Sequence, residues 1–117
     1  MAEPHRRRAI AYIAGRIITG SAAGSVFDYD EGRHVMFSGD ASKENVNVYD
    51  YDAACFITGP PTSLFHYGDS QHIQLGGEGG QFRGFDYASG AHFSGTVSGT
   101  SVTLFDYEDG AHHNYSI

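Results

Sequence analysis

An eight-residue motif that recurs five times constrains the fold of this 117-residue chain more than any other feature. The copies are FDYDEGRH, YDYDAACF, FHYGDSQH, FDYASGAH and FDYEDGAH, which start at Phe27, Tyr49, Phe65, Phe85 and Phe105. Each copy runs aromatic, Asp or His, Tyr, three turn-like residues, one variable residue and then His, with Phe56 in its place in the second copy. Such repetition is typical of an array built from one small structural unit.

Each copy is predicted to form a β-hairpin, because β-branched and aromatic residues lead into turns rich in Gly and Asp. A two-residue turn at Asp109 and Gly110 would place Tyr107 opposite His112, and the same register would apply to the other copies. With residues 9–20 as a first strand, we expect an all-β antiparallel meander of about ten or eleven short strands. The predicted fold is a closed barrel or sandwich, with a β-solenoid as the alternative.

Alternation along the strands gives each hairpin two faces. One face carries aliphatic residues such as Val26 and Val35 and is the expected core, together with the motif Asp residues, whose carboxylates should accept hydrogen bonds from turn amides. The other face is aromatic, which is unusual for a sheet side that normally meets water. The candidate binding residues lie on this second face: Tyr29, His34, Tyr51, Tyr67, His72, Tyr87, His92, Tyr107 and His112.

The formal charge of −7 is unevenly distributed along the chain. Arg6, Arg7 and Arg8 stand near the start, and the body of the chain is strongly acidic, so we expect no binding to nucleic acid. Residues 1–8 are interpreted as a flexible basic arm and residues 9–117 as a single domain. No apolar run is long enough to cross a membrane, and the single Cys55 is expected to be a buried thiol in a cytoplasmic protein.

The chain contains no recognisable catalytic motif, and the sequence indicates no catalytic residue, metal ligand set or cofactor. The first hypothesis is therefore a non-catalytic binding or interaction module, forming a homo-oligomer through the aromatic and histidine face. The second is a small-ligand-binding barrel with a cavity lined by Tyr and His. The third is a small enzyme with a His and Asp acid–base pair in that cavity.

Overall fold

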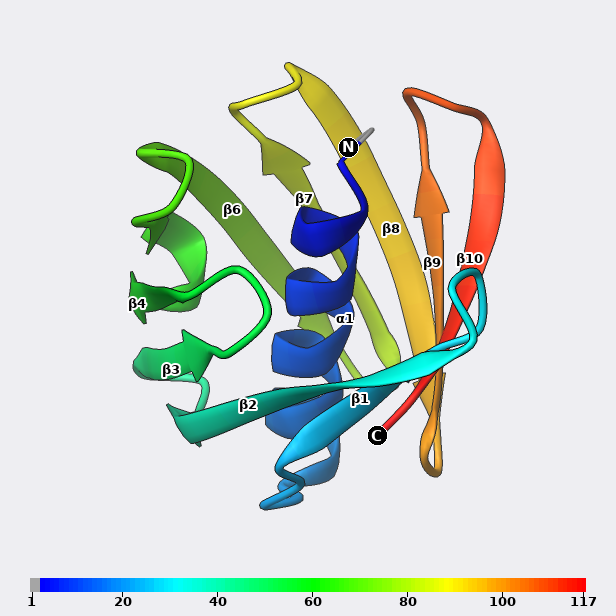
Figure 1. The fold of residues 1–117 in the computed structure, drawn as a ribbon. Coiled ribbons are helices and arrows are strands. Elements are labelled where there is room, and N and C mark those ends of the chain that lie inside the picture. Colours follow the sequence, from blue (N-terminus) through cyan, green and yellow to red (C-terminus); the bar gives the residue numbers. More distant parts are fainter. Residues whose placement is uncertain (1–2) are drawn as a thin grey trace.

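The computed structural model describes residues 3–117, in which ten strands form a closed antiparallel barrel (Figure 1). Each strand pairs with the next, and β1 closes the barrel against β10. The predicted meander of hairpins is therefore confirmed as a barrel with ten strands. The strands are β1 (Ser25–Asp28), β2 (Arg33–Ala41), β3 (Val46–Asp50), β4 (Cys55–Gly59), β5 (Leu64–His66), β6 (Gln71–Glu78), β7 (Gln81–Asp86), β8 (Ala91–Ser98), β9 (Ser101–Asp106) and β10 (Ala111–Ser116), with a 3-10 turn at Pro61–Ser63.

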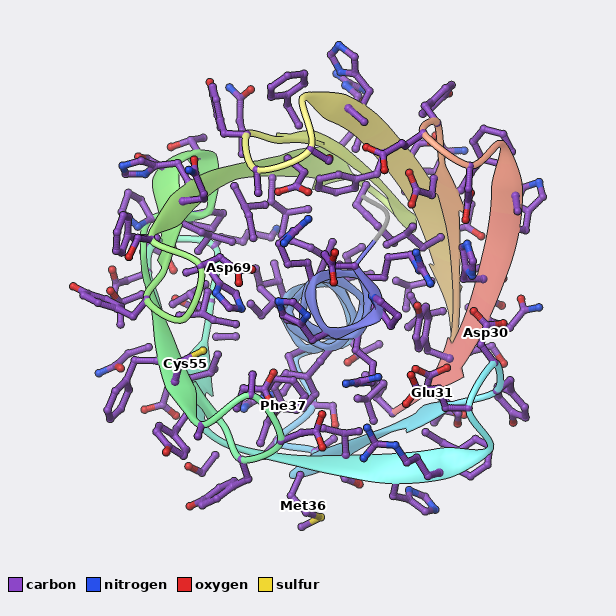
Figure 2. The ribbon with its side chains drawn as sticks, turned by 45° about the horizontal axis from the view of Figure 1, so that its top comes forward. Asp30, Glu31, Met36, Phe37, Cys55 and Asp69 are labelled. Carbon is purple, nitrogen blue, oxygen red and sulfur yellow. The ribbon has the colours of Figure 1, made fainter. Side chains whose placement is uncertain are left out.

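A helix, α1 (Pro4–Thr19), runs through the inside of the barrel (Figures 1 and 2). Residues 9–14 of this helix are at most 1% exposed. A closed barrel of more than eight strands has an interior wider than its own side chains fill, and a helix about 10 Å across occupies that space. The helix is therefore the centre of the hydrophobic core.

The expected first strand over residues 9–20 is wrong, because these residues belong to α1. Pro4 at the first helical position and Gly20 in the left-handed conformation at the other end are ordinary helix start and stop signals. The middle of the helix, residues 9–14, lacks an amphipathic pattern because protein surrounds it on all sides. A helical segment that is apolar all round is typically buried.

The expected flexible arm also needs correction. Arg6, Arg7 and Arg8 lie in the first turns of α1 and are 2–8% exposed, while residues 1 and 2 lie outside the described residues. Ion pairs with the barrel hold this segment, as described below. Within residues 3–117, no helix is long and apolar enough to cross a membrane.

The loops within the five repeated motifs have four residues each, whereas the sequence predicted two. Phe105 pairs with His112, and Tyr107 is the first loop residue. The other four hairpins share this register. The predicted Tyr–His pairs are therefore replaced by pairs between His and the first motif aromatic, and Tyr49 pairs with Phe56 in the second hairpin.

The faces of the strands are nevertheless as predicted, since a register change of two residues returns every side chain to the same side of the sheet. Val26, Val35 and the other aliphatic residues point inward against α1 and are buried. Tyr12 of the helix stacks on Phe37 of β2, with ring centroids 4.3 Å apart. Gly15 lies so close to the wall that a Cβ atom there would be 2.7 Å from Ile117 Cδ1.

Candidate functional site

The outer surface of the barrel carries an aromatic belt, which we define as the first, third and eighth residues of the five motifs. In each motif the first aromatic ring has the Tyr ring on one side and the His or Phe ring on the other. In the fifth motif the ring of Phe105 is 4.9 Å from Tyr107 and 4.7 Å from His112 between centroids, with an edge-on arrangement at both contacts. The other four motifs repeat this geometry.

All nine residues predicted to bind lie in this belt, on the outside of the barrel. The five motif tyrosines are 54–60% exposed, and the four motif histidines are exposed as well. They are separated from the interior by the barrel wall, so they do not line the inner cavity that the small-ligand hypothesis assumed. The motif Asp residues lie on the inner side of the same wall, which separates them from the belt histidines that the enzyme hypothesis would pair with them.

The belt is most apolar at the second hairpin. Phe56 stands where the other four hairpins have His, and it is 51% exposed. Met36, on the neighbouring β2, is 56% exposed and points away from the barrel, opposite in direction to Phe37 (Figure 2). The equivalent positions in the other hairpins are polar, namely Thr58, Gln74, Ser94 and Asn114. Tyr49 and Tyr51 lie between Met36 and Phe56, and these four residues form what we call the apolar patch.

Two hollows lie on the outer surface on the other side of the belt. One, of about 530 Å³, is bordered by Phe85, His92 and Tyr107, and the other, of about 370 Å³, by Phe105 and His112. Arg83 contributes to both. A separate apolar cavity of about 340 Å³ lies between the C-terminal half of α1 and strands β6 and β7, and none of the nine predicted residues borders it.

At the end of the barrel where α1 begins, which we call the mouth, four motif Asp residues form an inward ring. Each is buried, and one carboxylate oxygen accepts hydrogen bonds from the loop that follows it. In the second hairpin, Asp50 Oδ1 accepts the amides of Asp52 and Ala53 at 2.9 and 3.0 Å. Asp28, Asp86 and Asp106 accept loop amides in the same way. The predicted structural role of these residues is confirmed.

The first turns of α1 supply the positive charge that this ring requires. Successive helical residues point about 100° apart, so four consecutive side chains spread around the whole mouth. Arg6 reaches Asp69 and Asp86 at 2.9 and 3.0 Å. Arg7 lies 3.6 Å from Asp106 in the fifth hairpin, and Arg8 bonds to Asp28 in the first at 3.1 Å and to Asp52 in the second at 2.8 Å.

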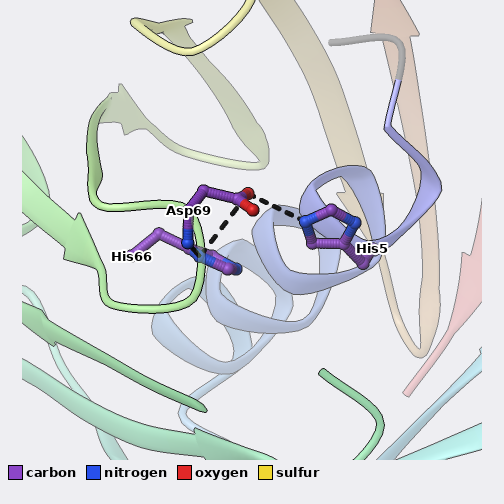
Figure 3. A group of neighbouring side chains, drawn as sticks. All are labelled: His5, His66 and Asp69. Carbon is purple, nitrogen blue, oxygen red and sulfur yellow. Dashed lines mark hydrogen bonds and ion pairs between the residues drawn. The ribbon is translucent and has the colours of Figure 1, made fainter. Parts of the chain in front are cut away.

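The third hairpin differs from the others at the mouth. His66 replaces the motif Asp and is fully buried, and it faces His5, the fourth of the consecutive helical side chains. His5 Nε2 is 2.8 Å from Asp69 Oδ2, and His66 Nδ1 is 3.6 Å from the same oxygen (Figure 3). The Sγ atom of Cys55 lies 3.8 Å from Nε2 and 4.0 Å from Nδ1 of His66. We call His5, Cys55, His66 and Asp69 the mouth cluster.

Burial and hydrogen bonds together determine the protonation states of Cys55, His66 and Asp69 in the mouth cluster. Burial lowers the pKa of His66, an effect larger than the opposing influence of the nearby Asp69 carboxylate. It also raises the pKa of Cys55, although the backbone N–H of Gly68 donates to the sulfur and partly opposes this. Burial of Asp69 favours its neutral form, but hydrogen bonds from Arg6 and His5 outweigh it and lower the pKa of the carboxyl group. At neutral pH the cluster therefore holds a thiol, a neutral His66 and a carboxylate.

This arrangement does not activate Cys55 as a nucleophile, since reactive cysteines are exposed thiolates in positive surroundings. Cys55 is 8% exposed, and its environment disfavours the thiolate. The four side chains are instead the types that bind transition metal ions, with two imidazoles, a thiol and a carboxylate.

A second group at the mouth contains Asp106, Asp109 and His113. His113 contacts carboxylates through both ring nitrogens, with Asp109 at 2.8 Å and with Asp30 of the first hairpin. This group joins the first and last hairpins, where β1 and β10 share only two register pairs among the described residues.

Sequence reasoning missed Met36 and the whole mouth cluster. The available signal was the departure of single residues from the repeat, such as His66 in place of Asp and Met36 in place of a polar residue. His5 had no such signal, because its position depends on the helix inside the barrel. Comparisons with protein-family models, curated proteins and solved structures found no match to this chain.

Proposed function

We propose that the protein is a non-catalytic interaction module of the cytoplasm that forms a homo-oligomer through its aromatic belt. The observation that supports this most is the exposure of the five belt tyrosines, at 54–60%, on the outside of a closed barrel. Exposed aromatic surfaces of this extent usually mark interaction sites, and Tyr is enriched in them. A single thiol without a disulfide partner fits a reducing compartment.

The apolar patch is the proposed centre of the interface. Its two departures from the repeat, Met36 and Phe56, both replace polar residues by apolar ones, and Tyr49 and Tyr51 connect them. Hot spots of protein interfaces are clusters of aromatic and apolar side chains enclosed by a polar rim. Arg33 and Asp52, which form an ion pair at 2.9 Å near this patch, would belong to that rim.

Charge also favours the patch over other contacts between two copies. A chain with a formal charge of −7 repels a second copy in most orientations. Met36, Tyr49, Tyr51 and Phe56 carry no charge at neutral pH, so contact here brings the fewest like charges together. A two-fold axis through the patch would use the same surface on both copies.

Sedimentation velocity tests the proposal with variants taken from the repeat itself. We expect the wild type to be a dimer or larger oligomer at tens of micromolar. The double substitution Met36→Gln and Phe56→His gives the second hairpin the residue types of the others, and it should shift the protein towards monomer. His92→Gln, on another sector of the belt, serves as the matched control and should leave the oligomer unchanged.

All three positions are exposed, so the variants should keep the wild-type circular dichroism spectrum and melting temperature. A wild type that is monomeric at tens of micromolar would refute self-association. An oligomer that survives the double substitution but dissociates with His92→Gln would move the interface away from the apolar patch.

Small-ligand binding is the second candidate, and the outer hollow of about 530 Å³ favours it. The hollow combines the rings of Phe85, His92 and Tyr107 with the charge of Arg83, which suits a small planar anion such as an aromatic carboxylate. Titration calorimetry with benzoate-like probes tests this idea. Binding that Arg83→Gln weakens and His72→Gln does not would support it, and absence of binding at millimolar probe would exclude this ligand class.

A further inference from the structure

We propose that the mouth cluster binds a transition metal ion that prefers tetrahedral coordination, above all Zn²⁺. The proposed ligands are His5, His66, Asp69 and Cys55. This site is independent of the proposed self-association, because it lies inside the mouth and the belt lies outside the wall. Four observations support it: the replacements within the repeat, an uncompensated buried carboxylate, the distances between ligand atoms, and access from solvent.

The repeat shows what the chain normally places here. Four hairpins have Asp at the ring position, and three of these carboxylates have an arginine of α1 within 4 Å. The third hairpin has His66 instead, and the helical residue facing it is His5 rather than an arginine. Cys55 stands where the fourth and fifth hairpins have Ala91 and Ala111. In this one sector of the ring, His66, His5 and Cys55 therefore provide metal-binding side chains where the fourth and fifth hairpins have an Asp, an Arg partner from α1 and an Ala.

The charge balance in this sector also indicates a missing cation. Asp50 is fully buried, and within residues 3–117 its Oδ2 atom has no hydrogen-bond partner. Asp50 is the cross-strand partner of Cys55, so its side chain lies beside the mouth cluster. A buried carboxylate oxygen without a partner is costly. A divalent cation bound between the neighbouring side chains would compensate it.

The distances suit a small ion after limited adjustment. The ligand atoms of His5, His66 and Asp69 all lie within 4.8 Å of one another, and Cys55 Sγ is 3.8 Å from His66. Ligand atoms around tetrahedral zinc are about 3.3–3.7 Å apart, given bonds of about 2.0–2.3 Å. Rotation of His5, on the first turn of α1, would bring the first three ligand atoms to these distances, and the Cys55 side chain would have to rotate as well to bring Sγ to the ion. The thiol proton would pass to solvent as the thiolate binds.

An ion can reach the site from the mouth. The side chains of His5 and Asp69 are 26% and 24% exposed, while His66 closes the inner side at 1%. Arg6 also bonds to Asp69, so the carboxylate would be shared between the ion and the guanidinium, as ligating carboxylates commonly are with outer partners.

The group of Asp106, Asp109 and His113 does not make the same case. Arg7 lies within 3.9 Å of both carboxylates, and the ring nitrogens of His113 contact Asp30 and Asp109. Side chains of the chain itself therefore already engage the carboxylates of this group. The sector of the mouth cluster, by contrast, has two buried or half-buried carboxyl groups, Asp69 in the cluster and Asp50 beside it, and Arg6 is the only Arg or Lys among the described residues in ion-pair contact with them.

The test uses the full-length chain without an affinity tag, equilibrated with Zn²⁺ or Co²⁺ at pH 7.5 and then freed of excess metal. We expect one ion per chain by elemental analysis. The Co²⁺ form should show the intense visible bands of tetrahedral coordination and the near-ultraviolet absorption of a cobalt–thiolate bond, and Zn²⁺ should remove both.

Two variants again take residues from the other hairpins, which keeps the fold intact. His66→Asp should weaken binding by roughly tenfold or more, because it replaces the imidazole by a shorter carboxylate, which loop amides engage in the other hairpins. Cys55→Ala should abolish the thiolate absorption while visible bands of a weaker complex remain. His72→Gln removes an exposed histidine of the same hairpin and should change neither the stoichiometry nor the spectrum.

A wild type that binds neither ion at stoichiometric amounts would overturn the proposal without any variant. Binding that persists unchanged in both His66→Asp and Cys55→Ala would also overturn it and would place the ion elsewhere, at the belt histidines or at the group of Asp106, Asp109 and His113. Loss of binding in His72→Gln, with binding retained in the other two variants, would overturn the proposal and assign the ion to the belt histidines.

Discussion

The fourth loop residue of each hairpin adopts the left-handed conformation, and only three of the five hairpins have glycine there. Gly32, Gly90 and Gly110 have φ between 66° and 70°, whereas Ala54 and Ser70 have φ of 54° and 52°. A residue with a Cβ atom is strained in this conformation, and glycine is not, although glycine loses more backbone entropy on folding.

Ala54→Gly and Ser70→Gly should therefore each stabilise the protein, by about 0.5–1 kcal/mol, since the relief of strain exceeds the entropic cost. Urea denaturation measures the effect. Gly110→Ala is the matched reverse variant, because a Cβ there would meet no atom within 4 Å and only the backbone matters. Destabilisation by both glycine substitutions would show that the loops are not strained.

The pH dependence of stability should depend in part on Asp52. Hydrogen bonds from Arg33, followed by the charges of Arg33 and Arg8, lower the pKa of this carboxyl below its unfolded value, although burial opposes them. A carboxyl group with a lowered folded pKa binds fewer protons when folded, so its contribution is complete above the unfolded pKa of about 3.9 and is lost as pH falls below it.

Asp52→Asn should consequently reduce the fall in unfolding free energy between about pH 5 and pH 3. The side chain is 34% exposed, so solvent screening limits the difference to less than about 1 kcal/mol. Glu44→Gln, on an exposed loop at the other end of the barrel, should leave the slope unchanged. Equal slopes for wild type and Asp52→Asn would contradict the assignment.

At the level of elements, the helix depends on its own charges to enter the barrel. Arg8 is 2% exposed and contacts Asp28, Glu31 and Asp52. Arg16 fixes the other end, donating to the carbonyl groups of Ser21 and Gly39 at 2.8 Å. The buried arginines of this helix are thus ion-paired at its start and hydrogen-bonded to carbonyl groups at its end.

Arg8→Met keeps the length of the side chain and leaves the buried Asp28 carboxylate without its cation. Loss of one member of a buried ion pair costs about 3–5 kcal/mol, and urea denaturation should show a loss in this range. Asp28→Asn in the same background should recover part of it, because the amide oxygen can still accept the loop hydrogen bonds. Arg33→Gln removes an exposed arginine and should cost less than about 1 kcal/mol.

A cost for Arg8→Met no larger than that for Arg33→Gln would mean that the mouth ion pairs do not hold α1 in place. Full additivity of Arg8→Met and Asp28→Asn would likewise show that the two residues do not interact.

The helix is also the element that sequence patterns could not assign. Ile10, Tyr12 and Ile13 have high strand propensity, and a helix buried on every side has no polar face to reveal its period. The loops were misassigned for a related reason. Asp-Gly indicates a two-residue turn, but the amides of Glu108 and Gly110 bond to Asp106, which extends the loop to four residues.

For the whole molecule, the repeat was sufficient to predict a meander of hairpins and the separation of aliphatic and aromatic faces. The repeat could not show whether the aromatic face would be on the outside of the barrel or would line a cavity, because both faces of each strand are apolar. The direction is set by α1, whose burial uses the aliphatic face and leaves Phe27, Tyr29 and their equivalents outside.

The candidate sites differ in the same way, because the sequence predicts what is repeated and does not predict what depends on the helix. The belt could be predicted because it is repeated, whereas the mouth cluster joins a helix to the second and third hairpins across 50 to 64 positions and depends on the helix direction. Both proposals rest on departures from the repeat, at Met36 and Phe56 outside and at His66 and Cys55 inside.

We propose that two copies of this protein meet at the apolar patch. Amide chemical shifts, recorded as the protein is diluted from millimolar to low micromolar concentration, test this contact most directly. We expect shifts that change with concentration at Met36, Tyr51 and Phe56, and not at His92 or His112. Shifts that stay constant over the whole range, or that change around His92 and not around Phe56, would contradict it.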